Sequence, residues 1–370
     1  MNSLLGSSAL TFGPVNQGPP TSHPKLGPPK DSRAVLDAIR RHDVTAYSDT
    51  DLKDAMARLR TRPPHPSVSQ VLPEVFAIVS EVISRRLGAW RLFDTGFDRK
   101  SLPESLQTCW RTADLSRGSS GTAATGPDQQ TIVDAMLMVH REIQVRPPWD
   151  ISMPAGFYQA LRRQDEKGHL TFEATEEQLL AGLHLFQGNI VQMNAGEGKT
   201  VAGAFPAVLH AVAGTSVYVI TANNYLAARD ADLLAPVYQS LGITVGAVLE
   251  YMEDDERRYN YQMAIVYSTM REMGFDYLRD NLKTTASSRV QGKLDAAIID
   301  EADHGLIDEA STPMIISGAP LGNRSPMAKV KKAVTQLIRL QRDVVRELAG
   351  ELARPDTSLD GASHILAKLL

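Results

Sequence analysis

Two short stretches in the second half of the chain carry residues that could bind and hydrolyse a nucleoside triphosphate. The first is N-A-G-E-G-K-T at residues 194–200, a turn with two glycines followed by a lysine and a hydroxyl residue. Backbone N–H groups of such a loop can point at phosphate oxygens, while the lysine reaches the β- and γ-phosphates and the hydroxyl ligates Mg²⁺. We therefore expect a phosphate loop for ATP, with Thr200 as a Mg²⁺ ligand, made of Asn194, Ala195, Gly196, Glu197, Gly198, Lys199 and Thr200.

The phosphate loop departs from the strict form of its motif at one position. The strict pattern has glycine five positions before Gly198, where this chain has Met193. A glycine at Gly196 instead is typical of a helicase-like variant of the loop. The apolar run N-I-V-Q-M at 189–193 predicts a buried strand before the loop, and V-A-G-A-F-P-A-V-L-H-A-V-A after it predicts a helix.

The second stretch is D-E-A-D at residues 300–303, directly after the apolar run A-A-I-I. A carboxylate at a strand end beside a phosphate loop suits a Mg²⁺ ion, and we expect Asp300 in that role. Glu301 could deprotonate the attacking water, which makes Glu301 and Lys199 the expected catalytic residues. Asp303 could bond loops that respond to the nucleotide. A solvated acidic loop is the ordinary alternative for these acids, and their pairing with a phosphate loop argues against it.

Gln178 is a candidate for recognition of the base. It lies fifteen residues before Met193, in the segment A-T-E-E-Q-L-L-A-G. A glutamine amide both donates and accepts hydrogen bonds, which matches the edge of adenine. We expect Gln178 to contact adenine.

These residues need a scaffold, and the chain predicts an α/β fold from about residue 170. Short β-branched runs alternate there with helical stretches: S-V-Y-V-I-T, T-V-G-A-V-L, A-I-V-Y-S and A-A-I-I-D. This alternation is typical of a parallel sheet wrapped by helices, in which ligands bind at the carboxyl ends of the strands.

Three longer segments resemble motifs of the SecA family of preprotein translocase motor ATPases. They are T-A-N-N-Y-L-A-A-R-D-A at 221–231, Y-S-T-M-R-E-M-G-F-D-Y-L-R-D-N-L at 267–282, and D-E-A-D-H-G-L-I-D-E-A-S-T-P-M-I-I-S-G at 300–318. The resemblance covers roughly residues 45–90 and 175–320. It implies a RecA-like P-loop NTPase sheet of the DEAD type, preceded by an α-helical N-terminal region.

The resemblance also implies roles for individual residues. On matching positions, Lys199 and Thr200 hold phosphate and Mg²⁺, Asp300 organises the Mg²⁺, and Glu301 is the catalytic base. Arg229 and Asp230 lie in the motif that couples the nucleotide to the rest of the motor. The segment around Gly274, Phe275, Asp276, Tyr277, Arg279 and Asp280 is expected to be structural, with Arg279 as an anchor of an ion pair.

As partners, the family implies preprotein substrates, a membrane protein-conducting channel and a second RecA-like domain, supplied in cis or in trans. Without that domain the chain is expected to hydrolyse ATP slowly, since an arginine acting on the γ-phosphate can be worth about 10³ to 10⁵ in rate. The resemblance places the protein in the cytoplasm and leaves room for peripheral contact with the inner face of the cell membrane.

The chain also departs from the family words. Asn224 stands where the family has Asp, Met270 and Arg271 where it has two Asn, and Ser311 where it has Arg. About 80 residues separate L-G-A-W-R-L-F-D from E-E-Q-L-L-A-G, where the family has almost none. No function follows from this insertion.

These observations divide the chain into four regions. We expect a disordered Pro/Gly-rich arm at 1–32, a helical region at 33–170 with the insertion at about 95–170, the RecA-like domain at 171–320, and a helical tail at 321–370 that begins a truncated preprotein-binding domain. Residues 112–130 are expected to form a loop or linker. Cys109 is the single cysteine, which excludes an internal disulfide and fits a reducing compartment.

Two other functions remain open from the sequence. A superfamily-2 nucleic-acid helicase is suggested by D-E-A-D, but the net charge of -4 gives no support for nucleic acid as a partner. The segment E-R-R-Y-N-Y-Q at 256–262 mixes charges and aromatics, and we interpret it as a solvated helix. The other alternative is a non-catalytic ATP-binding module that only interacts with partners.

Overall fold

The computed structural model describes residues 32–61, 68–115, 126–165, 168–316, 327–354, 363–364 and 367–368. The chain forms two compact units, Met1–Met314 and Ile315–Leu370. The arm expected at 1–32 lies outside the described residues except for Ser32.

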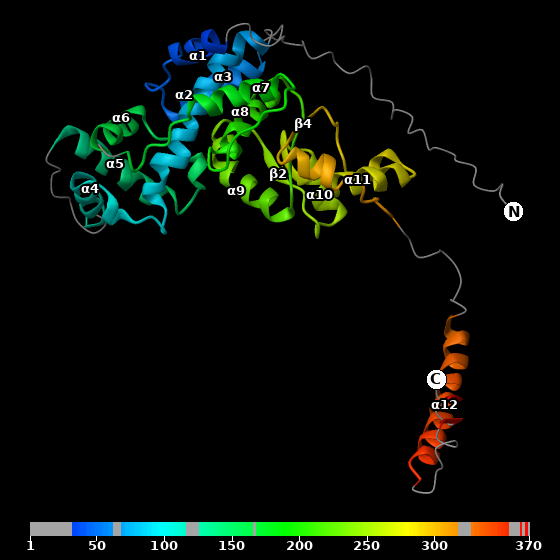
Figure 1. Cartoon of the computed structure of the whole chain (residues 1–370). Helices are drawn as coiled ribbons and strands as arrows, with labels where there is room; N and C mark the ends of the chain where they lie inside the picture. The colour runs from blue at the N-terminus through cyan, green and yellow to red at the C-terminus, as the bar shows by residue number, and fades with distance from the viewer. Residues whose placement is uncertain are drawn as a thin grey trace. The chain divides into compact units, whose positions relative to one another are not determined.

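A four-stranded parallel sheet carries the first unit and confirms the predicted α/β class (Figure 1). Its order is β2 (Val245–Ala247), β3 (Ile265–Thr269), β1 (Val217–Thr221) and β4 (Ala296–Ile299). In register, Val217 of β1 lies opposite Ile265 of β3 and Ala296 of β4. Strands β1 and β3 are buried along their whole length, which explains why they read as unbroken apolar runs.

Helices follow the strands and begin at their carboxyl ends. Helix α9 (Asn224–Ser240) starts after β1, where the Asn223 side chain accepts a hydrogen bond from the backbone N of Leu226. Helix α11 (Met270–Leu282) starts after β3, where Thr269 accepts from the backbone N of Glu272. These caps fix the loops at the edge of the sheet where ligands bind in such folds.

Three more helices complete this half of the unit. They are α7 (Glu176–Phe186), α8 (Lys199–Val212) and α10 (Asp254–Tyr261). Helix α8 is the helix predicted after the phosphate loop. The strand predicted before that loop is wrong: residues 189–194 are irregular and join none of the described strands. Ile190 is 96% exposed, so the apolar run there lacks the sheet neighbours that a buried strand needs.

The N-terminal helices pack against the part of the unit that holds the sheet. They are α1 (Ser32–Arg41), α2 (Asp49–Thr61) and α3 (Val68–Ile83), followed by the short helices η1 (Ser84–Gly88) and η2 (Ala89–Phe93). The rings of Phe76 in α3 and Phe205 in α8 lie 5.0 Å apart between centroids. One hydrophobic cluster therefore runs from these helices into the sheet.

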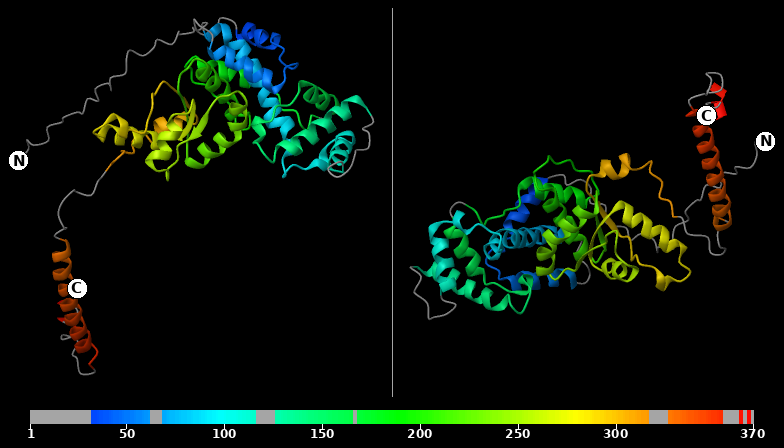
Figure 2. Two further views of the ribbon diagram at one scale, coloured as in Figure 1. Left: turned by 180° about the vertical axis from the view of Figure 1, so that it is seen from behind. Right: turned by 90° about the horizontal axis from the view of Figure 1, so that it is seen from below.

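The insertion forms helices with a hydrophobic cluster of their own. Its elements are η3 (Arg99–Ser101), α4 (Glu104–Leu115), α5 (Pro127–Glu142), η4 (Pro148–Asp150) and α6 (Ala155–Gln164). Leu106, Met136 and Phe157 are fully buried in this cluster. The helices gather at the end of the unit away from α10 and α11 (Figures 1 and 2). Of the loop expected at 112–130, residues 112–115 belong to α4 and 127–130 to α5, and residues 116–125 lie outside the described residues.

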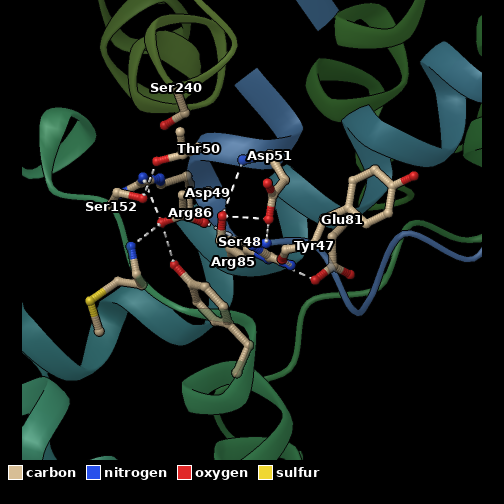
Figure 3. A network of polar contacts seen from close by, with 12 residues as sticks. Tyr47, Ser48, Asp49, Thr50, Asp51, Glu81, Arg85, Arg86, Ser152 and Ser240 are labelled. Carbon is tan, nitrogen blue, oxygen red and sulfur yellow. Dashed lines mark hydrogen bonds and ion pairs between the residues drawn. The ribbon is translucent and has the colours of Figure 1, made fainter. Parts of the chain in front are cut away.

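A buried ionic network ties the insertion to the N-terminal helices (Figure 3). The Asp49 carboxylate accepts hydrogen bonds from Arg85 Nη1 at 2.9 Å and Arg86 Nη2 at 3.2 Å. It also accepts from the Tyr158 hydroxyl of α6 at 2.9 Å and from the backbone N of Met153 at 3.1 Å. One side chain at the start of α2 thus holds donors from both parts.

The second unit contains helix α12 (Met327–Leu352), which lies in the predicted helical tail. Many of its apolar side chains are exposed, with Leu337 at 68% and Leu340 at 65%. In neither unit do the described residues include a helix long and apolar enough to cross a membrane.

Candidate functional site

The phosphate loop has a shape that its own side chains hold. Gly196 and Gly198 have φ values of 88° and 77°, in the left-handed region that favours glycine. The Glu197 carboxylate accepts hydrogen bonds from the backbone N of Asn194 at 2.8 Å and from its amide Nδ2 at 2.7 Å. Asn194 and Glu197 therefore close the turn, which leaves the backbone near Ala195 exposed.

Helix α8 begins at the loop without a side-chain cap. Gly198 is the N-cap residue and has no side chain to accept from the first turn. The first N–H groups of a helix have no partner inside the helix, and together with its dipole they attract an anion. The exposed Lys199 side chain adds a positive charge at the same point. The start of α8 is suited to phosphate.

Gln178 lies against the phosphate loop. It is 5% exposed, and its Nε2 donates to the backbone O of Glu197 at 2.8 Å. Its Oε1 accepts from the backbone N of Thr175 at 3.2 Å, in the capping box of α7. In this arrangement the amide supports the loop, and contact with adenine stays a prediction.

A cavity of about 80 Å³ brings the predicted phosphate and metal ligands together. Lys199, Thr200 and Asp300 all line it, although the lysine and the acid are a hundred residues apart in sequence. Its other walls are mostly apolar, from β1, β4 and α8. We call it the phosphate cavity.

Asp300 also lines a second, more polar cavity of about 150 Å³, together with Glu301. The backbone N of Asp300 donates to Ile220 O at 2.8 Å, so β4 continues beside β1 up to the acid. Asp303 is exposed and lines neither cavity. Asp300 thus stands between the loop and the expected base.

Glu301 has an unusual backbone. Its φ of 50° is the one positive value for a non-glycine residue in the part of the chain that the structure describes. This conformation costs a side-chain-bearing residue about 1 to 2 kcal/mol. Strained residues gather at functional sites, so the strain supports the interest in Glu301 as a reacting group.

Arg229 is held by its sequence neighbour. Its Nη2 lies 2.6 Å and its Nε 2.8 Å from Oδ1 of Asp230, and its side chain remains 49% exposed. Asp230 is 3% exposed, lines the phosphate cavity, and its Oδ2 lies 3.5 Å from the hydroxyl of Thr200. Arg229 therefore reaches the site through Asp230 in this structure.

The sequence interpretation missed a buried ion cluster behind the second cavity. Residues 256–261 fall in helix α10, as predicted, but Arg257 is 2% exposed instead of solvated. Its guanidinium contacts Glu272 at 2.9 Å and Asp276 at 2.8 Å. Arg279 also contacts Asp276, at 3.1 Å, which confirms it as an anchor of an ion pair. The buried acids of α11 were the available signal, since a buried carboxylate needs a cation.

The donor set fits Mg²⁺. Oxygen atoms of a hydroxyl and a carboxylate, Thr200 and Asp300, line one cavity, and Mg²⁺ prefers oxygen ligands completed by phosphate and water. Nowhere in the described residues do three or more His, Cys, Asp or Glu side chains converge as a metal site. The protein alone would thus provide part of the coordination shell.

Comparison with known proteins gives one consistent result. The SecA DEAD-like domain family matches residues 120–365. The chain is similar to protein translocase subunit SecA of Clostridium botulinum, at 46% identity over 217 residues, covering 58% of this chain and 26% of that protein. It is 40% identical to the Treponema denticola protein of the same name over 219 residues, covering 58% of this chain and 24% of that protein. The matched region spans about a quarter of either relative.

Proposed function

The chain belongs to the SecA DEAD-like domain family, and on this premise we propose that it is the nucleotide-binding part of a protein-translocation ATPase. It binds ATP with Mg²⁺ in the phosphate cavity. The observation that carries the proposal is the meeting of Lys199, Thr200 and Asp300 around that cavity.

Each residue has a role that follows from its place. The bare amides at the start of α8 and the Lys199 ammonium group bind the β- and γ-phosphates. Thr200 and Asp300 would hold Mg²⁺, which neutralises charge on the phosphates when bound. Glu301, next to Asp300, orients and deprotonates the attacking water. Gln178 keeps the loop in shape through its bond to Glu197, and we propose that it also contacts adenine.

The proposal extends to partners through the family. Its relatives are named translocase subunits, and we propose preproteins and a membrane protein-conducting channel as partners, with a second RecA-like domain in cis or in trans. The site of action is the cytoplasmic face of the membrane. In this scheme Arg229, bound to Asp230 beside Thr200, transmits the state of the nucleotide to partner domains, while Asp303 bonds loops that respond to it.

The two alternatives are not favoured by these findings. The D-E-A-D string of a nucleic-acid helicase also occurs in a SecA DEAD-like domain, and that family is the one matched. Stimulation of ATP hydrolysis by RNA at low salt would support the helicase. A non-catalytic module remains distinct from the proposal because it predicts no turnover, so steady hydrolysis by the chain would rule it out.

Calorimetric titration with ATP and Mg²⁺ tests the proposal. Lys199→Ala should abolish binding, because the ammonium group and the loop amides act on the same phosphates. Lys293→Ala is the matched control, since Lys293 is an exposed lysine of the same unit away from the loop, and it should bind as the original chain does. Equal binding by both variants would refute the phosphate site.

Glu301→Gln separates binding from chemistry. The variant should keep its affinity and lose hydrolysis by about 10²- to 10⁴-fold, the usual contribution of a general base. Phosphate release measured beside the titration checks this. Unchanged turnover would place the base elsewhere.

A further inference from the structure

Asp230 is a buried acid whose contacts point to a role at the Mg²⁺ site. Its side chain is 4% exposed, in helix α9, and it lines the phosphate cavity with Lys199, Thr200 and Asp300. One carboxylate oxygen is bound by Arg229, at 2.6 Å. The other lies 3.5 Å from the Thr200 hydroxyl.

The hydrogen bond between Thr200 and Asp230 fixes the direction of one proton. A hydroxyl group has one proton to donate and two lone pairs to accept with. An ionised carboxylate has no proton, so the shared hydrogen comes from Thr200. When the Thr200 O–H bond points at Asp230, the lone pairs of the hydroxyl oxygen point away from the acid and towards the cavity. A cation bound in the cavity could accept them.

We propose that Asp230 is a positioning residue that orients the Thr200 hydroxyl for Mg²⁺, with Arg229 holding the carboxylate in place. The inference rests on the proposed function and adds an outer contact to its metal site. Such outer hydrogen bonds orient ligands directly bound to a metal, and their loss costs about 10- to 100-fold in metal affinity.

The other carboxylate that lines the cavity has a different hydrogen-bond partner. Asp300 lines the same cavity, but its Oδ1 accepts the backbone N of Glu301 at 3.0 Å. Helices α8 and α9 alone position Thr200 and Asp230, because Thr200 lies in the first turn of α8 and Asp230 lies in the middle of α9. The 3.5 Å separation is longer than the usual O–H···O distance of about 2.5 to 3.0 Å, so the contact itself should stabilise the free chain little.

Asp230→Asn tests the inference through the Mg²⁺ dependence of ADP binding. Arg229 would bind the amide oxygen and turn the NH₂ group towards Thr200, so the hydroxyl would have to accept and would lose a lone pair to the protein. Calorimetry with ADP should show that the gain in affinity caused by Mg²⁺, measured against EDTA, falls by about 10- to 100-fold. Affinity in EDTA should stay the same.

Four further variants separate positioning from structure. Asp232→Asn removes the same charge from an exposed position of α9 and should keep the full gain. Thr200→Val should lose the gain, and adding Asp230→Asn to it should cause no further loss, because both act through one hydroxyl. Asp230→Glu keeps the ion pair with Arg229 but moves the carboxylate oxygen that accepts from Thr200. It should therefore also lose the gain in ADP affinity caused by Mg²⁺. This variant replaces Asp230→Asn in the test if the asparagine variant unfolds.

Each outcome decides the matter. An unchanged gain in Asp230→Asn or Asp230→Glu overturns the inference and leaves the ATP site intact. An equal loss of affinity with Mg²⁺ and with EDTA shows a structural role and also overturns it. Additive losses in the double variant contradict a shared hydroxyl. If the original chain binds no nucleotide, the proposed function fails, and the inference with it.

Discussion

At the scale of single residues, Gly198 shows two constraints on one position. Its φ of 77° suits glycine, as expected for a loop that approaches a phosphate. A Cβ there would also collide with the amide of Gln178. The first constraint could be predicted from the G-x-G-K-T pattern. The second could not, because the hydrogen bond from Gln178 to Glu197 depends on how α7 packs on the loop.

Gly198→Ala and Gly196→Ala separate these constraints. Both residues have positive φ, but nothing lies near a Cβ added at Gly196. Gly196→Ala should lower the free energy of unfolding by about 1 kcal/mol through backbone strain. Gly198→Ala should lower it by a further 1 to 3 kcal/mol or so, the usual cost of overpacking. Urea unfolding without nucleotide measures the free energy of unfolding of both variants. Equal losses would show that the Gln178 side chain moves away from the added Cβ at no cost in stability.

At the scale of elements, the sequence pattern predicted those helices and strands that are determined by residues close together in the chain. The four runs of β-branched residues predicted β1 to β4, and the central strands β1 and β3 are largely apolar because both of their faces are buried. The run at 189–193 has the same texture but no strand beside it, and sequence alone does not show which neighbours are present. The prediction of a solvated helix was wrong at Arg257 for a similar reason, since its partners Glu272 and Asp276 come from another helix.

The link between the insertion and the N-terminal helices should depend on Asp49. Replacing Asp49 with Ala removes the acceptor of Arg85, Arg86 and Tyr158 and leaves charge in a buried place. The free energy of unfolding should fall by about 3 kcal/mol, at the low end for a broken buried pair, because Glu81 still binds Arg85.

The matched control for Asp49 is Asp54→Ala, an exposed acid on the same helix. It should change the free energy of unfolding by less than about 0.5 kcal/mol. Denaturant unfolding of both variants gives the comparison. Similar small losses in both would mean that the hydrophobic contacts alone join the two parts.

At the scale of the whole molecule, the phosphate cavity provides less than phosphoryl transfer requires. Among the described residues that line it, Lys199 is the one cation. The matched region also spans only about a quarter of the SecA relatives. Under the proposed function, binding and hydrolysis can therefore be separated: the first unit would supply the groups for binding, and full rate would need a further positive charge at the γ-phosphate.

The 370-residue chain by itself should therefore hydrolyse ATP slowly, about 10³- to 10⁵-fold below a complete motor, the range that an added arginine is worth. Phosphate release under single-turnover conditions measures the rate, with Lys199→Ala as the background, because that variant should not hold the substrate. Adding the remaining part of a SecA relative as a separate chain should raise the rate if it supplies the missing charge. Motor-like turnover by the chain alone would contradict the prediction and would require a second cation to reach the phosphate cavity from within this chain.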